Sequence, residues 1–116
     1  MGQNQDNFKR GTAELLVLHL LQKEDLYGYQ ITQSFADKSG GAYTMLEGSL
    51  YPILYRLTEL GYVSDYTKLV GKRRTRRYYH LEDSGREYYK EILGDYLTII
   101  NSINKILDRE VDTDAG

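Results

Sequence analysis

The spacing of apolar and polar positions predicts three helices, a two-stranded hairpin and one long final helix, in that order along the chain. Leucine and valine cover most of the circumference of the first predicted helix, Phe8 to Gln22. A helix that is apolar nearly all round must be sandwiched between two partners. In so small a chain, another subunit is a candidate for the second partner. The polar residues 1–7 and the acidic tail 110–116 are expected to be flexible termini.

The second helix is predicted after Leu26. Ile31 and Phe35 are four residues apart and share one of its faces, and the glycine pair Gly40-Gly41 is expected to end it. Residues 42–46 are short and extended in pattern, which favours a small strand.

The third helix is predicted from the only proline of the chain, Pro52. Proline is tolerated in the first turn of a helix, where its missing N–H has no intrahelical partner, so the helix is expected to begin near Gly48 or Ser49, with Ser49 as its N-cap. Its buried stripe is predicted to consist of Leu50, Ile53, Leu54, Leu57 and Leu60. The opposite, exposed side holds Ser49, Tyr51, Pro52, Tyr55 and Arg56.

Two extended runs rich in tyrosine, 62–69 and 75–81, flank a turn that contains Gly71. This pattern predicts a β-hairpin. Asp83 or Ser84 is expected to cap a final helix that runs to about residue 109.

The final helix carries apolar residues at alternating spacings of four and three, which is the pattern of a packing seam between helices. The seam consists of Tyr89, Leu93, Tyr96, Ile100, Ile103 and Leu107, and it is widened by Ile92, Ile99 and Ile106. A helix of about 25 residues is about 37 Å long, which is more than the rest of the domain can easily cover. We therefore expect a homodimer whose interface is this seam, although such a stripe is also common in packing within one chain.

The positive charge of the chain is concentrated in residues 68–81. This stretch contains six of the 15 basic residues and none of the 17 acidic ones, so the remainder of the chain has 9 basic against 17 acidic residues. The six are Lys68, Lys72, Arg73, Arg74, Arg76 and Arg77. A basic hairpin is suited to binding a polyanion, although taken alone it is also a common solvated surface.

Three helices followed by a hairpin are the order of a winged helix-turn-helix, a mainly α (α+β) fold, here with a long C-terminal dimerisation helix. We expect a DNA-binding domain over residues 8–82 and a dimerisation helix over residues 83–109. In this geometry the third helix enters the major groove and the wing grips phosphates. The predicted DNA-binding residues are Ser49, Tyr51, Pro52, Tyr55, Arg56, Lys72, Arg73, Arg74, Arg76 and Arg77. The alternative for Tyr51 and Tyr55 is that they cover the core.

Several stretches resemble the signature of PadR-like transcriptional regulators. They are Leu26-Tyr27-Gly28-Tyr29-Gln30-Ile31, Gly48-Ser49-Leu50-Tyr51-Pro52-Ile53-Leu54-Tyr55-Arg56-Leu57, Leu60-Gly61-Tyr62-Val63 and Arg76-Arg77-Tyr78-Tyr79-His80-Leu81, followed by Gly85. The single helix after Gly85 is similar to the small subfamily in which that helix makes the dimer. The resemblance implies a bacterial repressor that binds an inverted-repeat operator as a homodimer.

The resemblance also implies an effector site for an aromatic or cationic small molecule between the first and last helices, while other small members lack an effector. Phe8, Tyr89, Leu93, Tyr96 and Ile100 are the candidate lining residues. The alternative is that Tyr89 and Tyr96 only pack the interface.

Other classes of function find little support in the sequence. There is no cysteine, and His19 and His80 have no metal-spaced partners, so no metal, cofactor or catalytic site is expected. No apolar run approaches the ~18 residues of a membrane span, and the chain is expected to be cytoplasmic. A winged-helix module that binds protein or RNA through the basic wing remains the alternative function.

Overall fold

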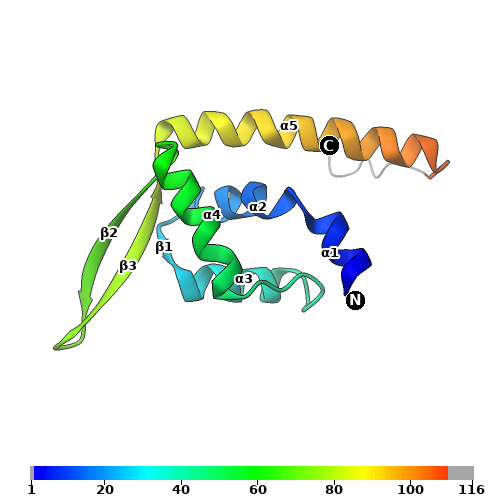
Figure 1. Ribbon diagram of the computed structural model, residues 1–116. Helices are drawn as coiled ribbons and strands as arrows, with labels where there is room; N and C mark the ends of the chain where they lie inside the picture. Colours follow the sequence, from blue (N-terminus) through cyan, green and yellow to red (C-terminus); the bar gives the residue numbers. More distant parts are fainter. Residues whose placement is uncertain (1, 110–116) are drawn as a thin grey trace.

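The computed structural model describes residues 2–109, which form five helices and one three-stranded antiparallel sheet. The helices are α1 (Gln3–Lys9), α2 (Thr12–Leu20), α3 (Gly28–Lys38), α4 (Glu47–Glu59) and α5 (Asp83–Ile106), and the strands are β1 (Leu26–Tyr27), β2 (Val63–Val70) and β3 (Arg74–Leu81). Figure 1 shows α5 spanning the molecule, the hairpin β2–β3 projecting from one end of it, and α4 between α5 and α3. This is the predicted winged helix-turn-helix.

The sheet has the order β1-β3-β2, and the hairpin runs in register from Val63 opposite Leu81 to Val70 opposite Arg74. The short strand β1 pairs with the other edge of β3, with Leu26 opposite Tyr79. Tyr79 and Leu81 point into the core and the tip of the hairpin lies far from it. The wing is therefore anchored at its base and free at its tip.

One core unites α2, α3 and α4 with the base of the sheet. Its buried side chains are Val17, Leu18, Leu21, Leu26, Ile31, Phe35, Leu50, Leu54, Leu57, Val63, Tyr79 and Leu81. Within the predicted stripe of α4, Leu50, Leu54 and Leu57 are buried, whereas Leu60 is 50% exposed. Helix α2 packs against both α3 and α5, so α5 of the same chain supplies the second partner that its apolar surface requires.

The single helix predicted from Phe8 to Gln22 is in fact divided. Helix α1 ends at Lys9, followed by the extended Arg10, and Gly11, with a left-handed φ of +87°, is the N-cap of α2. Residues Gln3 to Asn7, which were expected to form a flexible lead-in, are helical in α1. The tail 110–116 lies outside the described residues.

Three predicted details of the helix ends were wrong. Helix α4 begins at Glu47, with Leu46 as its N-cap, because the Ser49 N–H already donates to the Leu46 carbonyl (3.0 Å). Pro52 therefore lies in the second turn, and the carbonyl it leaves without a donor belongs to the exposed Gly48. The N-cap position of α5 is Glu82, which makes no side-chain capping bond, and neither Asp83 nor Ser84 occupies it. The Ser84 hydroxyl donates instead to the Gly61 carbonyl (2.8 Å). It ends at Ile106, before the predicted residue 109.

The strand predicted over residues 42–46 is not formed. Side-chain hydrogen bonds fold this segment into turns instead: the Tyr43 N–H donates to Ser39 Oγ (2.9 Å), and the Tyr43 hydroxyl pairs with that of Thr12 (2.7 Å).

Candidate nucleic-acid interface

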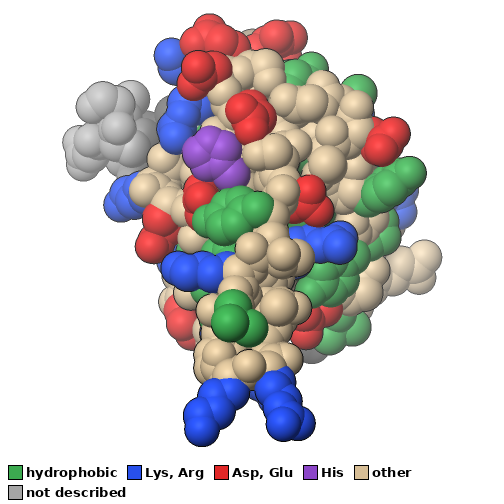
Figure 2. Space-filling view, turned by 90° about the vertical axis from the view of Figure 1, so that its left-hand side faces the viewer, with side chains coloured by type: hydrophobic (Ala, Val, Ile, Leu, Met, Phe, Trp, Pro, Cys, Tyr) green, Lys and Arg blue, Asp and Glu red, His purple; other side chains and the backbone are tan. Residues whose placement is uncertain are grey.

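The tip of the hairpin carries three cations that no carboxylate neutralises. Gly71, with a φ of +74°, makes the turn after β2, and Lys72, Arg73 and Arg74 follow it as the wing tip. Among residues 2–109, no ion pair involves these three side chains. Figure 2 shows basic side chains alone at the lower end of this face, while acidic side chains gather toward the opposite end. The wing tip is thus the strongest feature of positive charge on this surface.

The next two arginines point to opposite faces of β3, as strand alternation requires. The Arg77 Nε lies 3.5 Å from Asp65 Oδ2, on the same face as the buried Tyr79. The Arg76 guanidinium lies over the ring of Tyr27 on the other face, 4.3 Å from its centroid. Both arginines are therefore held by neighbours, unlike the wing tip.

Tyrosine side chains cover the face of the sheet that carries Arg76, and Asp25 lies at one end of them. Tyr78 stacks on Tyr66 and meets Tyr27 edge-on, with centroids 5.7 and 5.4 Å apart. Asp25, in the turn before β1, accepts a hydrogen bond from the Tyr66 hydroxyl (2.7 Å), and its Oδ1 lies 2.7 Å from His80 Nδ1. Burial would raise the pKa of Asp25, but the bonds from His80 and Tyr66 and the charge of a protonated His80 together lower that pKa below its usual 3.8. Asp25 thereby fastens both strands of the hairpin to the helical body.

Four exposed residues of α4 form the surface that we call the reading face: Ser49, Tyr51, Pro52 and Tyr55. Tyr55 is 69% exposed. Tyr51 is 45% exposed, its ring packs against Gly28 at the start of α3, and its hydroxyl donates to Glu47 Oε1 (3.2 Å). Burial and the Glu47 carboxylate raise the pKa of Tyr51. Contacts with Gly28 and Glu47 hold the side chain of Tyr51 in place, whereas the side chain of Tyr55 is largely exposed to solvent.

Arg56 is placed differently from the other predicted residues of α4. Its guanidinium forms an ion pair with Glu14 of α2, and the second carboxylate oxygen of Glu14 accepts a hydrogen bond from the Tyr88 hydroxyl of α5 (2.9 Å). Sequence reasoning missed Glu14 because it lies 42 residues from Arg56. Its only local signal was an acidic residue within an apolar helix.

The outer half of α5 presents an apolar surface that the described chain leaves open. Of the predicted seam, Tyr96, Ile103 and Leu107 are 38, 44 and 60% exposed, while Tyr89, Leu93 and Ile100 are half-buried. Ile99 and Ile106, from the predicted widening line, are 57 and 80% exposed.

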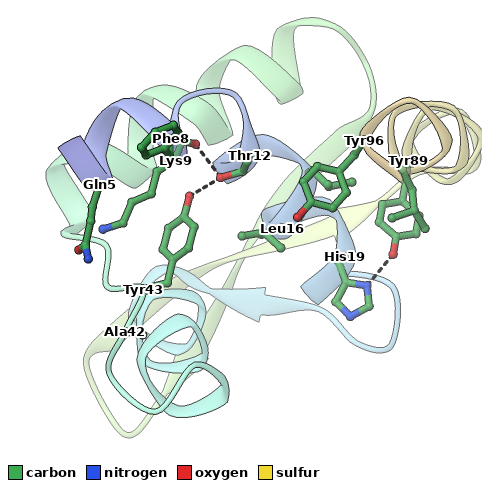
Figure 3. A pocket seen from close by; sticks show the side chains of 12 residues that line it. Gln5, Phe8, Lys9, Thr12, Leu16, His19, Ala42, Tyr43, Tyr89 and Tyr96 are labelled. Carbon is green, nitrogen blue, oxygen red and sulfur yellow. Dashed lines mark hydrogen bonds between the residues drawn. The ribbon is translucent and has the colours of Figure 1, made fainter. Parts of the chain in front are cut away.

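A cavity of about 670 Å³ lies between α1, α2, α5 and the α3–α4 connection (Figure 3). Four of the five predicted effector residues line it: Phe8, Tyr89, Leu93 and Tyr96. Ile100 instead lines a neighbouring groove, which also contains Phe8, Glu14 and Tyr96. The structure adds Lys9, Thr12, His19 and Tyr43 to the lining.

Polar side chains of this cavity are oriented by one another. Tyr89 and His19 point toward each other in Figure 3, with 2.6 Å between the Tyr89 hydroxyl and His19 Nδ1. Burial raises the pKa of Tyr89. The Lys9 ammonium lies 4.9 Å from the centre of the Tyr43 ring. Sequence reasoning had assigned His19 to an apolar helix and Tyr43 to a strand, so neither was predicted here.

Two further features bear on the class of protein. In the described part of the chain, no group of three or more His, Cys, Asp or Glu side chains is placed to hold a metal ion. Over the same residues, no helix has the length and apolarity to cross a bilayer.

Comparison with known proteins places this geometry in a family. Residues 17–91 match the model of the transcriptional regulator PadR-like family. A transcriptional regulator from Clostridium thermocellum has a similar structure, with a TM-score of 0.80 and 30% identity over 85% of this chain and 96% of that one. The negative transcriptional regulator PadR of Bacillus subtilis is 34% identical over 71 residues, which are 61% of this chain and 39% of that regulator.

The structure of Bacillus subtilis PadR in complex with operator DNA is also similar, with a TM-score of 0.66 and 30% identity over 73% of this chain and 48% of that one. This chain spans less than half the length of that regulator. The family consists of transcriptional regulators and not of enzymes, in agreement with the sequence. The match of the family model over residues 17–91, together with the winged helix-turn-helix, shows that the chain belongs to the PadR-like family of transcriptional regulators.

Proposed function

We propose that this protein is a transcriptional repressor that binds an inverted-repeat operator as a homodimer. The observation that carries the proposal is the wing tip, Lys72, Arg73 and Arg74, which lies at the free end of the hairpin without any carboxylate partner among the described residues. Phosphates are the natural counter-ions for such a group. The relative from Bacillus subtilis, seen with operator DNA, supports the same use of the fold.

Affinity and sequence preference come from different parts of this surface. The wing tip supplies contacts with phosphates, which position the protein but carry no sequence information. The reading face presents two tyrosines and a serine, whose hydroxyls donate and accept hydrogen bonds at base edges. The Arg77–Asp65 pair lies on the α4-facing side of the wing. Arg77 therefore joins the phosphate contacts when its ion pair with Asp65 is replaced by one with a DNA phosphate.

The dimer would form through the open surface of α5. Burial of its isoleucine, leucine and tyrosine side chains against a second copy removes a continuous apolar stripe from water. A twofold axis through this interface gives two wings and two copies of α4. Such pairs meet half-sites about 34 Å apart, one turn of B-DNA.

The cavity beside α5 is proposed as the effector site. Its volume of about 670 Å³ is in the range of small-molecule sites, and its lining is aromatic, with Phe8, Tyr43, Tyr89 and Tyr96. Among residues 2–109, Lys9 and His19 line it and no carboxylate does, although the Lys9 Nζ lies 3.9 Å from Asp6 Oδ1 outside the lining. This composition supports the aromatic part of the predicted ligand chemistry and disfavours a cation.

The test is the binding of a random-sequence 30-base-pair duplex by the purified protein as salt is varied. Replacement of Lys72, Arg73 and Arg74 by alanine should reduce the slope of log K against log salt by up to about 5 per dimer, given about 0.9 per phosphate contact. The control removes the same charge from exposed positions elsewhere, Lys23, Lys38 and Lys90, and should retain the parent slope. Equal slopes for the two triple variants would exclude the wing. Preference for single-stranded RNA over the duplex would instead favour the alternative function.

A further inference from the structure

The only basic residue of α4 is held away from the reading face. Helix α4 contains Glu47 and Glu59 and a single cation, Arg56. Arg56 lies one helical turn after Pro52 and therefore on the same side of the helix. Its side chain is 57% exposed, yet its guanidinium is paired with Glu14 of α2. With Arg56 neutralised, α4 offers two carboxylates and no free cation to a DNA backbone.

The surroundings of Glu14 stabilise its ion pair with Arg56. Its side chain is only 21% exposed, and both carboxylate oxygens are occupied, one by Arg56 and the other by the Tyr88 hydroxyl at 2.9 Å. A carboxylate removed from water needs a counter-charge, and the loss of that partner costs more than the pair itself contributes. A phosphate that competes for Arg56 must therefore leave Glu14 partly buried and uncompensated.

We propose that Glu14 sets the sequence discrimination of this protein by withholding Arg56 from the DNA backbone. This inference rests on the proposed DNA-binding function. Phosphate contacts raise affinity for every sequence alike. Because the cations available to phosphate are confined to the wing, α4 gains its binding energy from contacts with base edges. DNA of a different sequence does not supply these contacts and is bound more weakly. Arg56 accordingly belongs to the scaffold of the interface and not to the predicted DNA contacts.

The experiment compares the salt dependence of binding to the random-sequence duplex for the parent and four variants. Glu14→Gln retains the shape and the hydrogen bond to Tyr88 but frees Arg56. One additional phosphate contact per subunit should steepen the slope by about 1.8 per dimer, so that each halving of salt raises the affinity about 3.5-fold more than for the parent. Addition of Arg56→Gln to this variant should restore the parent slope. Glu91→Gln, at an exposed position of α5, controls for the loss of one negative charge and should match the parent.

Each outcome of this experiment either supports or overturns the role proposed for Glu14. An unchanged slope for Glu14→Gln, or a steeper slope that persists in the double variant, overturns the inference, because Arg56 would not be the released group. Arg56→Gln alone needs no change at Glu14 and should retain the parent slope. A slope reduced by about 1.8 would show that Arg56 already contacts phosphate in the parent. The proposed function fails separately, if the parent itself does not bind duplex DNA through its wing tip.

Discussion

The ring of Tyr51 lies directly over Gly28, so closely that a methyl group at Gly28 would come within 2.5 Å of the Tyr51 hydroxyl oxygen and 3.0 Å of its Cζ. This contact joins the first residue of α3 to the reading face of α4. A glycine is therefore needed at position 28 because the Tyr51 ring leaves no room for a side chain. The backbone conformation is not the reason, since the φ of Gly28 is not positive. The contact fixes the direction in which the phenol points.

Gly28→Ala should displace Tyr51 and change the sequence preference of the protein. We expect a loss of about 1 kcal/mol in the free energy of unfolding, and a set of selected DNA sequences that resembles the set selected by Tyr51→Phe. Removal of the hydroxyl relieves the closest contact, so the double variant Gly28→Ala/Tyr51→Phe should be more stable than the sum of the single changes. Strict additivity in urea denaturation would show that the two residues do not interact.

Two glycines of α5 should respond to alanine with opposite signs. A Cβ at Gly85 would lie 2.2 Å from the Tyr62 carbonyl oxygen and 2.6 Å from Leu81 Cδ1, while a Cβ at Gly94 has no neighbour within 4 Å. Gly85→Ala should cost about 2 kcal/mol or more, because a backbone oxygen cannot move aside cheaply. Gly94→Ala should gain about 0.5–1 kcal/mol from helix propensity. Urea denaturation of the two variants measures both effects, and equal signs would contradict the packing at Gly85.

Ile103→Glu should convert the proposed dimer to a monomer. Ile103 is 44% exposed in the single chain, so its replacement leaves the fold intact but introduces a charge into the proposed interface, where it would be buried without a partner. Thr98→Glu adds the same charge on the opposite side of α5 and serves as the control. Analytical ultracentrifugation should give the 13.5 kDa mass of one chain for the first variant and twice that mass for the second. A dimeric Ile103→Glu would place the interface elsewhere.

Asp25 should contribute stability that disappears in acid. The pKa of Asp25 is lowered in the folded protein, so the fold favours its charged form. This stability is fully present above the unfolded value of 3.8 and is lost as the pH falls through the folded pKa below it. Asp25→Asn should be about 1 kcal/mol less stable than the parent at pH 7, a modest figure because the carboxylate is partly solvated. Chemical denaturation as a function of pH should show the difference shrinking below about pH 4; a constant difference would mean that the carboxylate charge is not involved.

The aromatic cavity should select ligands by charge. We expect 2-naphthoate to bind more tightly than 1-naphthylmethylammonium, because Lys9 and His19 line the cavity and no carboxylate of the described chain does. Tyr96→Ala should weaken the binding about tenfold, the loss of one aromatic contact of about 1.4 kcal/mol. Tyr29→Ala, at an exposed tyrosine outside the cavity, should have no effect. Isothermal titration calorimetry measures all six combinations of ligand and protein, and tighter binding of the cation would contradict the assigned chemistry.

Much of the fold was predictable because its causes are local. The hairpin was predicted to within one residue at each strand end, since period-two alternation and Gly71 at the turn define it without reference to the rest of the chain. The ends of the helices were less predictable. Ser49 and Ser84 are both good N-caps by residue type, but Ser49 is already inside α4, and the hydroxyl of Ser84 is taken by the distant Gly61 carbonyl.

The sequence by itself determined the order of the main helices and the hairpin, the concentration of positive charge on the wing and the apolar stripe of the last helix, because periodicity and composition are properties of neighbouring residues. It did not reveal the division of the first helix or the short strand β1. Only the tertiary structure decided which of these charges are free. Arg56 and the wing tip are equally basic in the sequence, yet Glu14 neutralises Arg56 across 42 residues, and Tyr88 reaches the same carboxylate across 74. An ion pair depends on distance in space and on burial, and no local pattern encodes either for residues so far apart.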